Sequence, residues 1–88
     1  MAWQVRLESR VEKELDKIGS ADRERILRYL FNRVATLENP RDLGEALAGS
    51  WSGHWKYRLG DYRIIAKLED RIVTVTVVKI GNRREVYR

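Results

Sequence analysis

The stretch WKYRLGDYRI at residues 55–64 decides the fold of this 88-residue chain. Up to Leu59, apolar residues at odd positions alternate with basic residues at even positions, which is the period of a strand with one buried face. Gly60 and Asp61 are typical of a two-residue hairpin turn, because glycine accepts the positive φ that such a turn requires. The alternation resumes at residues 62–68, so the stretch predicts two paired antiparallel strands.

A two-residue turn fixes which side chains lie opposite each other across this hairpin. Arg58 is expected to face Arg63, and Lys56 lies on the same side of its strand as Arg58. Three cations then share one face, although like charges placed opposite each other destabilise a strand pair. The acidic residues of the segment 51–88 fall in apparent turns and in the tail. We therefore predict that this face binds a polyanion.

The rest of the chain supplies further strands and a pair of helices. Ser9 and Ser20 are expected to cap the two helices. The predicted elements are a strand at 3–7, helices at 9–18 and 20–37, a helical turn at 43–47, a central strand at 71–80 and a brief last strand at 85–87. These elements predict a single α+β domain over residues 1–88, with a twisted, mostly antiparallel β-sheet and an N-terminal helical hairpin packed on one face.

The charge of the chain is concentrated in its second half. Residues 1–50 hold nine Lys or Arg and nine Asp or Glu, whereas residues 51–88 hold nine and four, which accounts for the net charge of +5. Arginine outnumbers lysine 13 to 5, and arginine suits bidentate phosphate contacts. These features favour a nucleic-acid partner over a membrane, and we expect a soluble, cytoplasmic protein without a signal peptide or membrane span.

Few kinds of catalysis fit the residues that are present. The absence of cysteine excludes thiolate chemistry and disulfides, and one histidine with scattered acids predicts no metal site and no cofactor. RNA cleavage remains possible, because the substrate supplies its own nucleophile, the ribose 2′-OH. The candidate catalytic residues are Lys56, Arg58, Arg63, Arg83 and Tyr87.

Each candidate has a role that its chemistry suggests. Lys56 is predicted to be the general base, because neighbouring arginines favour its neutral form. Arg63 and Arg83 are suited to clamp the phosphate, and Tyr87 to stack on a base or to bond near the scissile phosphate. Arg84 and Arg88 in the tail are predicted to contact the RNA backbone. The alternative is that both are surface residues without a binding role.

The hairpin stretch together with the ending GNRREVYR at residues 81–88 resembles the RelE-type toxins of the RelE/ParE superfamily, and the resemblance covers nearly the whole chain. It implies a type II toxin that enters the ribosomal A site and cleaves the mRNA there. It also implies a RelB-like antitoxin that wraps the toxin, in a complex that is hetero-oligomeric. The residues that match the active face of the family are Lys56, Arg58, Arg63, Arg83 and Tyr87.

The chain departs from the family pattern at two positions. Asn82 stands where many relatives carry histidine, so the acid-base role of that histidine is absent here. Arg58 stands where some members carry lysine, and arginine is a poor proton acceptor, which places more weight on Lys56.

Two alternatives to a ribonuclease are kept open. One is a non-enzymatic toxin like the ParE branch, which shares the fold and poisons DNA gyrase. The other is a basic RNA-binding module without turnover. Discrete mRNA cuts, DNA damage with intact mRNA, or salt-sensitive binding alone would separate the three.

Overall fold

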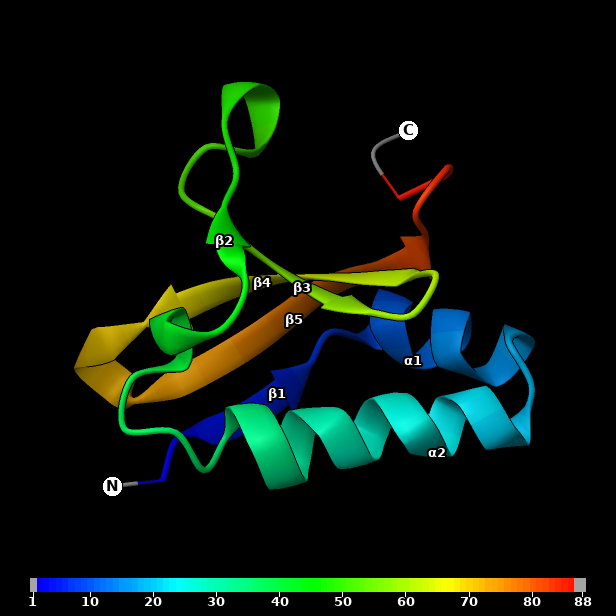
Figure 1. Cartoon of the computed structure of the whole chain (residues 1–88), viewed down its shortest axis with the longest axis horizontal. Coiled ribbons are helices and arrows are strands. Elements are labelled where there is room, and N and C mark those ends of the chain that lie inside the picture. The colour runs from blue at the N-terminus through cyan, green and yellow to red at the C-terminus, as the bar shows by residue number, and fades with distance from the viewer. Residues whose placement is uncertain (1, 87–88) are drawn as a thin grey trace.

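A five-stranded sheet covered on one side by two helices forms the fold (Figure 1). A computed structural model describes residues 2–86 of the chain. The strands are β1 (Gln4–Leu7), β2 (Glu45–Ala46), β3 (Trp55–Leu59), β4 (Tyr62–Glu69) and β5 (Thr74–Asn82), and the helices are α1 (Ser9–Lys17) and α2 (Ser20–Tyr29). The sheet order is β1-β5-β4-β3-β2, with β1 parallel to β5 and the other pairs antiparallel. The predicted α+β fold with its mostly antiparallel sheet is confirmed.

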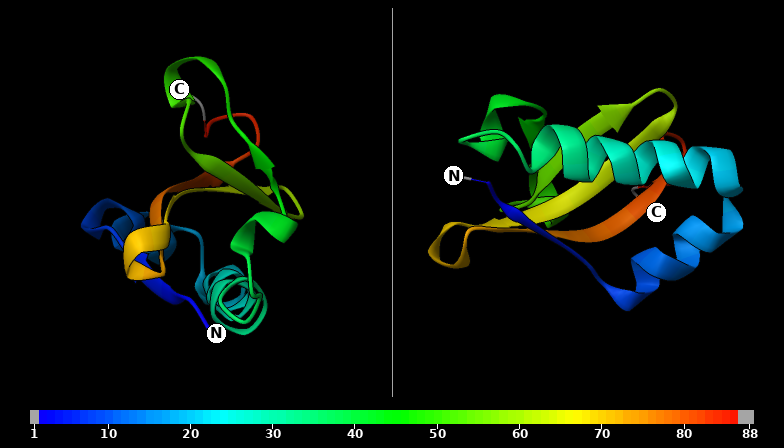
Figure 2. Two further views of the ribbon diagram at one scale, coloured as in Figure 1. Left: turned by 90° about the vertical axis from the view of Figure 1, so that its left-hand side faces the viewer. Right: turned by 90° about the horizontal axis from the view of Figure 1, so that it is seen from below.

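Both helices cover the same face of the sheet (Figures 1 and 2). They start at Ser9 and Ser20, so the prediction that these serines are N-caps is wrong. Glu8 and Gly19 occupy the N-cap positions, and neither end has a side-chain cap hydrogen bond. Gly19 has a φ of 91°, a conformation that favours glycine where the chain reverses between the helices. After α2 the chain continues through a π-helical turn at Leu30–Val34.

The main core lies between the helices and this face of the sheet. Its buried members are Trp3, Val11, Leu15, Ile26, Leu30, Val34, Tyr57, Ile64, Ala66, Val75, Val77 and Ile80. Tyr57 belongs to the alternating stretch that predicts β3, and its neighbours Trp55 and Leu59 pack against the same core. The odd positions of the stretch thus face the core, as predicted. Fully burying a large apolar side chain such as that of Tyr57 stabilises a fold by roughly 1.5–3 kcal/mol.

The hairpin of β3 and β4 has the predicted register. Arg58 pairs with Arg63 and Lys56 pairs with Ile65 across the two strands. Gly60 adopts a φ of 58° in the two-residue turn, which is the left-handed conformation that favours glycine. The basic side chains of the hairpin therefore share the face that the helices leave open.

The strand β5 lies between β1 and β4, which confirms the prediction that the apolar run near the C-terminal end forms a central strand. Its pairing with β4 skips Val78, so that strand bulges there. Side chains of α1 reach the bulged edge: Arg10 donates to the Val78 carbonyl from Nε at 3.3 Å and from Nη2 at 3.2 Å. Glu14 Oε1 accepts the backbone N–H of Ile80 at 3.2 Å. The helix thus satisfies backbone groups that no neighbouring strand reaches.

Two local predictions are wrong. The predicted helical turn at 43–47 contains instead the short strand β2, which pairs with β3 at the edge of the sheet. The predicted last strand at 85–87 starts in a turn, in which the Glu85 N–H donates to the Asn82 carbonyl. The rest of that segment, with Tyr87, lies outside the described residues. The tail therefore turns back after β5 and does not extend the sheet within residues 2–86.

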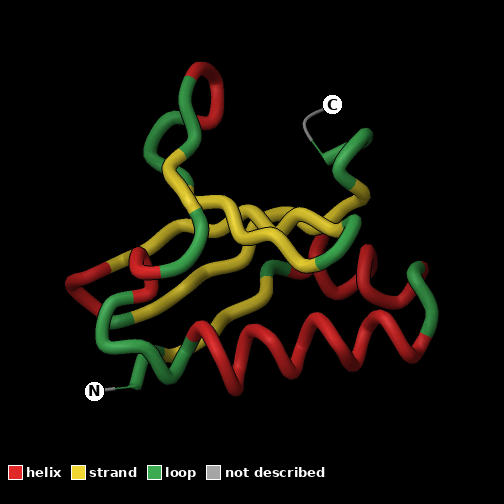
Figure 3. Tube along the Cα trace, in the orientation of Figure 1, coloured by secondary structure: helices red, strands yellow, loops and turns green. Residues whose placement is uncertain are grey.

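Two segments rise from the open face of the sheet (Figure 3). One is the connection between β2 and β3, and the other is the chain after β5. Both lie on the side of the sheet opposite to the helices. They therefore stand on the same face as the basic side chains of the hairpin.

Candidate functional site

The basic side chains of the open face form two neighbouring rows across the sheet. The first row contains Arg58 and Arg63, which are directly paired across β3 and β4. The second row contains Lys56, Ile65 and Lys79, because Ile65 pairs with one lysine on β3 and the other on β5. Sequence analysis missed the second lysine, because a bulge in β5 sets its register and the sequence pattern does not locate that bulge.

An acidic residue also lies on this face, which the sequence analysis did not anticipate. Glu45 of β2 pairs in register with Lys56 of β3, and its Oε1 lies 2.8 Å from the lysine Nζ. The side chain of Glu45 is 68% exposed and that of Lys56 is 22% exposed. The hydrogen bond and positive charge of Lys56, with a smaller contribution from Arg58, hold the pKa of Glu45 below its usual value. The basic face therefore contains a carboxylate that is ionised at neutral pH.

Close backbone packing places Glu45 in this position. Gly44 precedes it with a φ of 73°, and an added Cβ would collide with the carbonyl oxygen of Lys56. The same Cβ would lie 2.9 Å from the indole nitrogen of Trp55, which itself donates to the Leu43 carbonyl at 2.6 Å. Only a residue without a side chain lets β2 approach β3 this closely.

The hairpin turn holds two of the predicted arginines together. Arg63 Nη1 donates to the carbonyl of Gly60 at 3.0 Å and to that of Tyr62 at 2.9 Å. The backbone N–H of Arg83 donates to the Asp61 carbonyl at 2.8 Å. Within residues 2–86, neither arginine forms an ion pair with an acidic side chain. Their guanidinium charges are therefore not neutralised by the described part of the chain.

A shallow cavity of about 170 Å³ opens beside this turn. It is lined by Asp61, Asn82, Arg83 and Arg84. Arg84 is exposed, and its backbone N–H donates to Asn82 Oδ1 at 3.1 Å. The structure thus places Arg84 next to Arg83 at the end of the basic face, and its contact with RNA stays a prediction.

A small second apolar cluster fixes the tail on the open face. Val86 is fully buried against Ile65 and Val78, with Leu47 and Trp51 packed around them. Leu47 and Trp51 belong to the connection between β2 and β3, so both projecting segments meet in this cluster. Their packing holds the arginines that precede Val86 near the hairpin turn.

Truncating the anchor of the tail tests its importance. Val86→Ala is expected to cost roughly 1–3 kcal/mol of unfolding free energy, because two buried methyl groups are lost. Chemical denaturation measures the loss. As a control, Ile72→Ala changes an exposed side chain in the turn between β4 and β5, and should leave the free energy of unfolding nearly unchanged.

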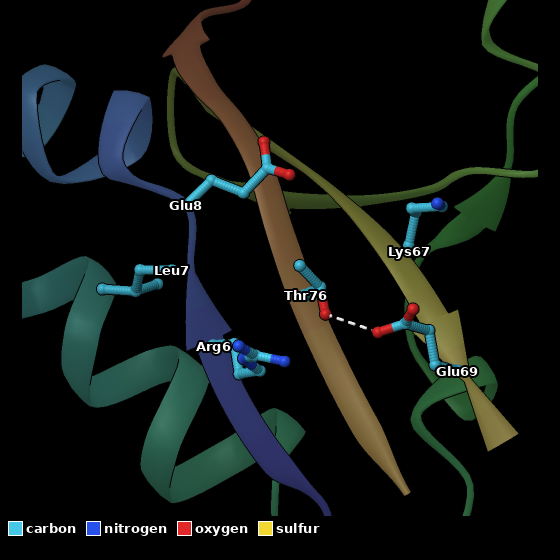
Figure 4. Close-up of a pocket in the computed structure, with 6 residues that line it drawn as sticks. All are labelled: Arg6, Leu7, Glu8, Lys67, Glu69 and Thr76. Carbon is cyan, nitrogen blue, oxygen red and sulfur yellow. Dashed lines mark hydrogen bonds between the residues drawn. The ribbon is translucent and has the colours of Figure 1, made fainter. Parts of the chain in front are cut away.

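The end of the open face that lies away from the hairpin turn carries both acidic and basic side chains. Arg6, Thr76 and Lys67 form a row across β1, β5 and β4, and line a cavity of about 270 Å³ (Figure 4). Glu8 and Glu69 line it too, and Glu69 Oε2 accepts the Thr76 hydroxyl at 2.7 Å. Two carboxylates here offset two cations, so we place the candidate anion site at the hairpin end.

The structure brings together most of the predicted site. Lys56, Arg58 and Arg63 lie on one face, and Arg83 is joined to the hairpin turn at the end of that face. Tyr87 and Arg88 lie outside the described residues. Among residues 2–86, no group of three or more His, Asp or Glu side chains could hold a metal ion. In the same part of the chain, no helix is both long and apolar enough to cross a membrane.

The sequence matches known toxins along almost its whole length. A family model described as the ParE toxin of the type II toxin-antitoxin system parDE matches residues 5–87. The chain is 34% identical over 90 residues to the mRNA interferase toxin RelE of Escherichia coli strain K12, covering 99% of this chain and 92% of that protein. It is also 23% identical over 88 residues to the toxin RelG of Mycobacterium tuberculosis, covering 100% and 99% of the two chains.

Solved structures have the same fold. A mutant of Escherichia coli RelE in the free state superposes with a TM-score of 0.75 at 32% identity, covering 99% of this chain and 92% of RelE. A toxin-antitoxin complex from Mycobacterium tuberculosis gives a TM-score of 0.86 at 20% identity, covering 94% and 100% of the chains. Sequence and fold agree over nearly the entire chain, and the protein belongs to the RelE/ParE superfamily of type II toxins as a RelE-type member.

Proposed function

We propose that this toxin is an endoribonuclease that cleaves mRNA in the ribosomal A site and so inhibits translation. The observation that carries this proposal is the basic face itself, where Lys56, Arg58 and Arg63 occupy neighbouring rows and Arg83 is joined to the hairpin turn. The identity to RelE, which is named an mRNA interferase, supports the same activity.

The proposed reaction uses the ribose 2′-OH as the nucleophile and needs no metal. The 2′-oxygen attacks the neighbouring phosphorus, and the bond from phosphorus to the 5′-oxygen breaks. The guanidinium groups of Arg58, Arg63 and Arg83 stabilise the charge that builds up on the phosphate oxygens. Lys56 takes part in the proton transfers, and Tyr87 stacks on a base or bonds near the phosphate. The products are a 2′,3′-cyclic phosphate and a free 5′-OH.

The toxin is proposed to act in the cytoplasm and to be held inactive by a RelB-like antitoxin in a hetero-oligomeric complex. A solved structure of the Escherichia coli RelE mutant with a RelB peptide, at 28% identity to this chain, supports a partner of that kind. An antitoxin that neutralises this toxin must cover a basic face, so we expect the covering segment to be acidic.

Mapping RNA ends after brief induction of the chain tests the proposed function. We expect new 5′ ends at discrete positions in translated mRNA, and none in the same transcript without a start codon. Purified toxin should cut mRNA on programmed ribosomes, and a single 2′-deoxy substitution at the cleaved nucleotide should abolish the cut. Intact mRNA during growth arrest would refute the proposal.

The match to a ParE family model favours a second candidate, a non-enzymatic toxin that acts on DNA gyrase. This function predicts DNA breaks with intact mRNA after induction. A basic module that only binds RNA would give neither result, and its binding would weaken steeply with salt. The same induction experiment therefore separates all three functions.

A further inference from the structure

The turn of the β3–β4 hairpin determines where the guanidinium group of Arg63 lies. Arg63 Nη1 donates to the carbonyl of Gly60 at 3.0 Å and to that of Tyr62 at 2.9 Å. Both carbonyls belong to the turn or to the residue that directly follows it. A shift of the turn would therefore move the positive charge that is proposed to stabilise the phosphate.

Helix α2 contacts the same turn from the other side of the sheet. The Tyr62 hydroxyl donates to Asp22 Oδ2 at 2.9 Å, although the two residues are 40 positions apart in sequence. The guanidinium of Arg25 fills the space beside Gly60, where an added Cβ would lie 2.6 Å from its Nη2. Arg25 Nη1 also lies 3.9 Å from Asp22 Oδ1. Two neighbouring side chains of α2 thus hold the turn in place.

The alternation of side chains along β4 connects this contact to the site. Tyr62 packs against the core on the helix side, and Arg63, the next residue, points to the open face. The carbonyl of the peptide group between them accepts a hydrogen bond from Arg63 Nη1 at 2.9 Å. The hydrogen bond to Asp22, with burial as a smaller cause, raises the pKa of the Tyr62 hydroxyl above its usual value. The hydroxyl is therefore a hydrogen-bond donor at neutral pH.

We propose that Tyr62 and Asp22 are positioning residues for RNA cleavage, an inference that rests on the proposed ribonuclease function. Their hydrogen bond fixes the hairpin turn relative to α2, and the turn in its place holds the Arg63 guanidinium where the scissile phosphate binds. Neither side chain touches the reacting atoms. A charge that is already in place stabilises a transition state better than one that has to move into position, so loosening the turn slows the chemical step.

Tyr62→Phe tests the proposal, because phenylalanine keeps the ring in the core and loses only the hydroxyl. We expect single-turnover cleavage at saturating programmed ribosomes to slow about 10-fold, less than removal of the whole Arg63 charge would cost. Binding to the ribosomes should stay within about twofold of the wild type, since no contact with RNA is lost. Asp22→Ala should slow cleavage equally, whereas Asp22→Asn keeps an acceptor for the hydroxyl and should restore most of the rate.

Tyr57→Phe is the matched control for the loss of a tyrosine hydroxyl. The Tyr57 hydroxyl donates to the Pro40 carbonyl at 2.7 Å from a fully buried side chain of β3. This hydrogen bond joins β3 to the connection that precedes β2 and does not involve the hairpin turn. The variant should be destabilised in denaturant unfolding, yet cleave within about twofold of the wild-type rate. Equal slowing by Tyr57→Phe and Tyr62→Phe would overturn the proposal, because general destabilisation would then explain both.

Combining Tyr62→Phe with Arg63→Ala shows whether the effect passes through the arginine. With Arg63 absent, we expect Tyr62→Phe to slow cleavage by less than about threefold, because the group that it positions is gone. A full 10-fold loss in that background would overturn the proposal, as would a wild-type rate in Tyr62→Phe alone. A wild-type chain that cuts no RNA at all would instead overturn the ribonuclease function, and this proposal with it.

Discussion

Alanine in place of Arg63 is expected to slow RNA cleavage by about 10²- to 10³-fold, the usual effect of removing one preorganised group that stabilises transition-state charge. The side chain lies on the open face opposite Arg58 and meets no acidic partner among residues 2–86. Its positive charge is therefore available to a phosphate. Single-turnover cleavage on programmed ribosomes measures the loss.

The same substitution should leave the fold largely intact. Arg63 donates two hydrogen bonds to carbonyls of its own hairpin turn, and each partly exposed bond contributes about 1 kcal/mol. Arg71→Ala is the matched control, since it removes an exposed arginine in the turn that follows the other end of β4. Arg83→Ala is expected to be at least ~10²-fold slower as well. Near-normal cleavage by both Arg63→Ala and Arg83→Ala would show that the face is not the site.

Gly44→Ala is expected to cost about 3 kcal/mol or more of unfolding free energy. Its φ of 73° is strained for a residue with a side chain, and the new methyl group would strike the Lys56 carbonyl and crowd Trp55 and Tyr57. Strain in the left-handed region costs of order 1–3 kcal/mol, and overpacking typically costs another 1–3. Because β2 would be pushed away from β3, Glu45 would also lose its position beside Lys56.

A second glycine, in the connection between β2 and β3, separates the effect of backbone strain from that of the collision. Gly49 has a similar φ of 65°, but a Cβ there would meet nothing within 4 Å. Gly49→Ala should therefore show the cost of the backbone conformation alone, roughly 1 kcal/mol. Denaturant unfolding of both variants gives the difference. Equal losses at the two positions would show that close packing against β3 does not require Gly44.

Local periodicity was enough to predict the parts of the fold that depend on neighbouring residues. The alternation of apolar and polar residues from Trp55 to Leu68 predicts the strands β3 and β4. A two-residue turn between them also fixes which residues pair across the two strands. The apolar run before Ile80 gives a strand buried on both faces. The helices follow from their apolar spacing, although the residue at each N-cap could not be identified from the serine preference alone.

The missing parts of the site depend on contacts between distant segments. The bulge at Val78 is stabilised by Arg10 and Glu14 of α1, so no local pattern near Val78 locates it or places Lys79. The strand that carries Glu45 has two residues, too few for any periodicity. The prediction that acids lie in turns and in the tail covers only residues 51–88, so it does not include Glu45, which pairs with Lys56 from the first half of the chain.

The position of β5 has a consequence for how the toxin is made. This strand pairs with β1 on one side and with β4 on the other, although within residues 2–86 it follows all the other strands in sequence. Contacts between such distant segments close late in folding. The nascent polypeptide therefore cannot complete this sheet, and with it the basic face, until β5 has left the ribosome.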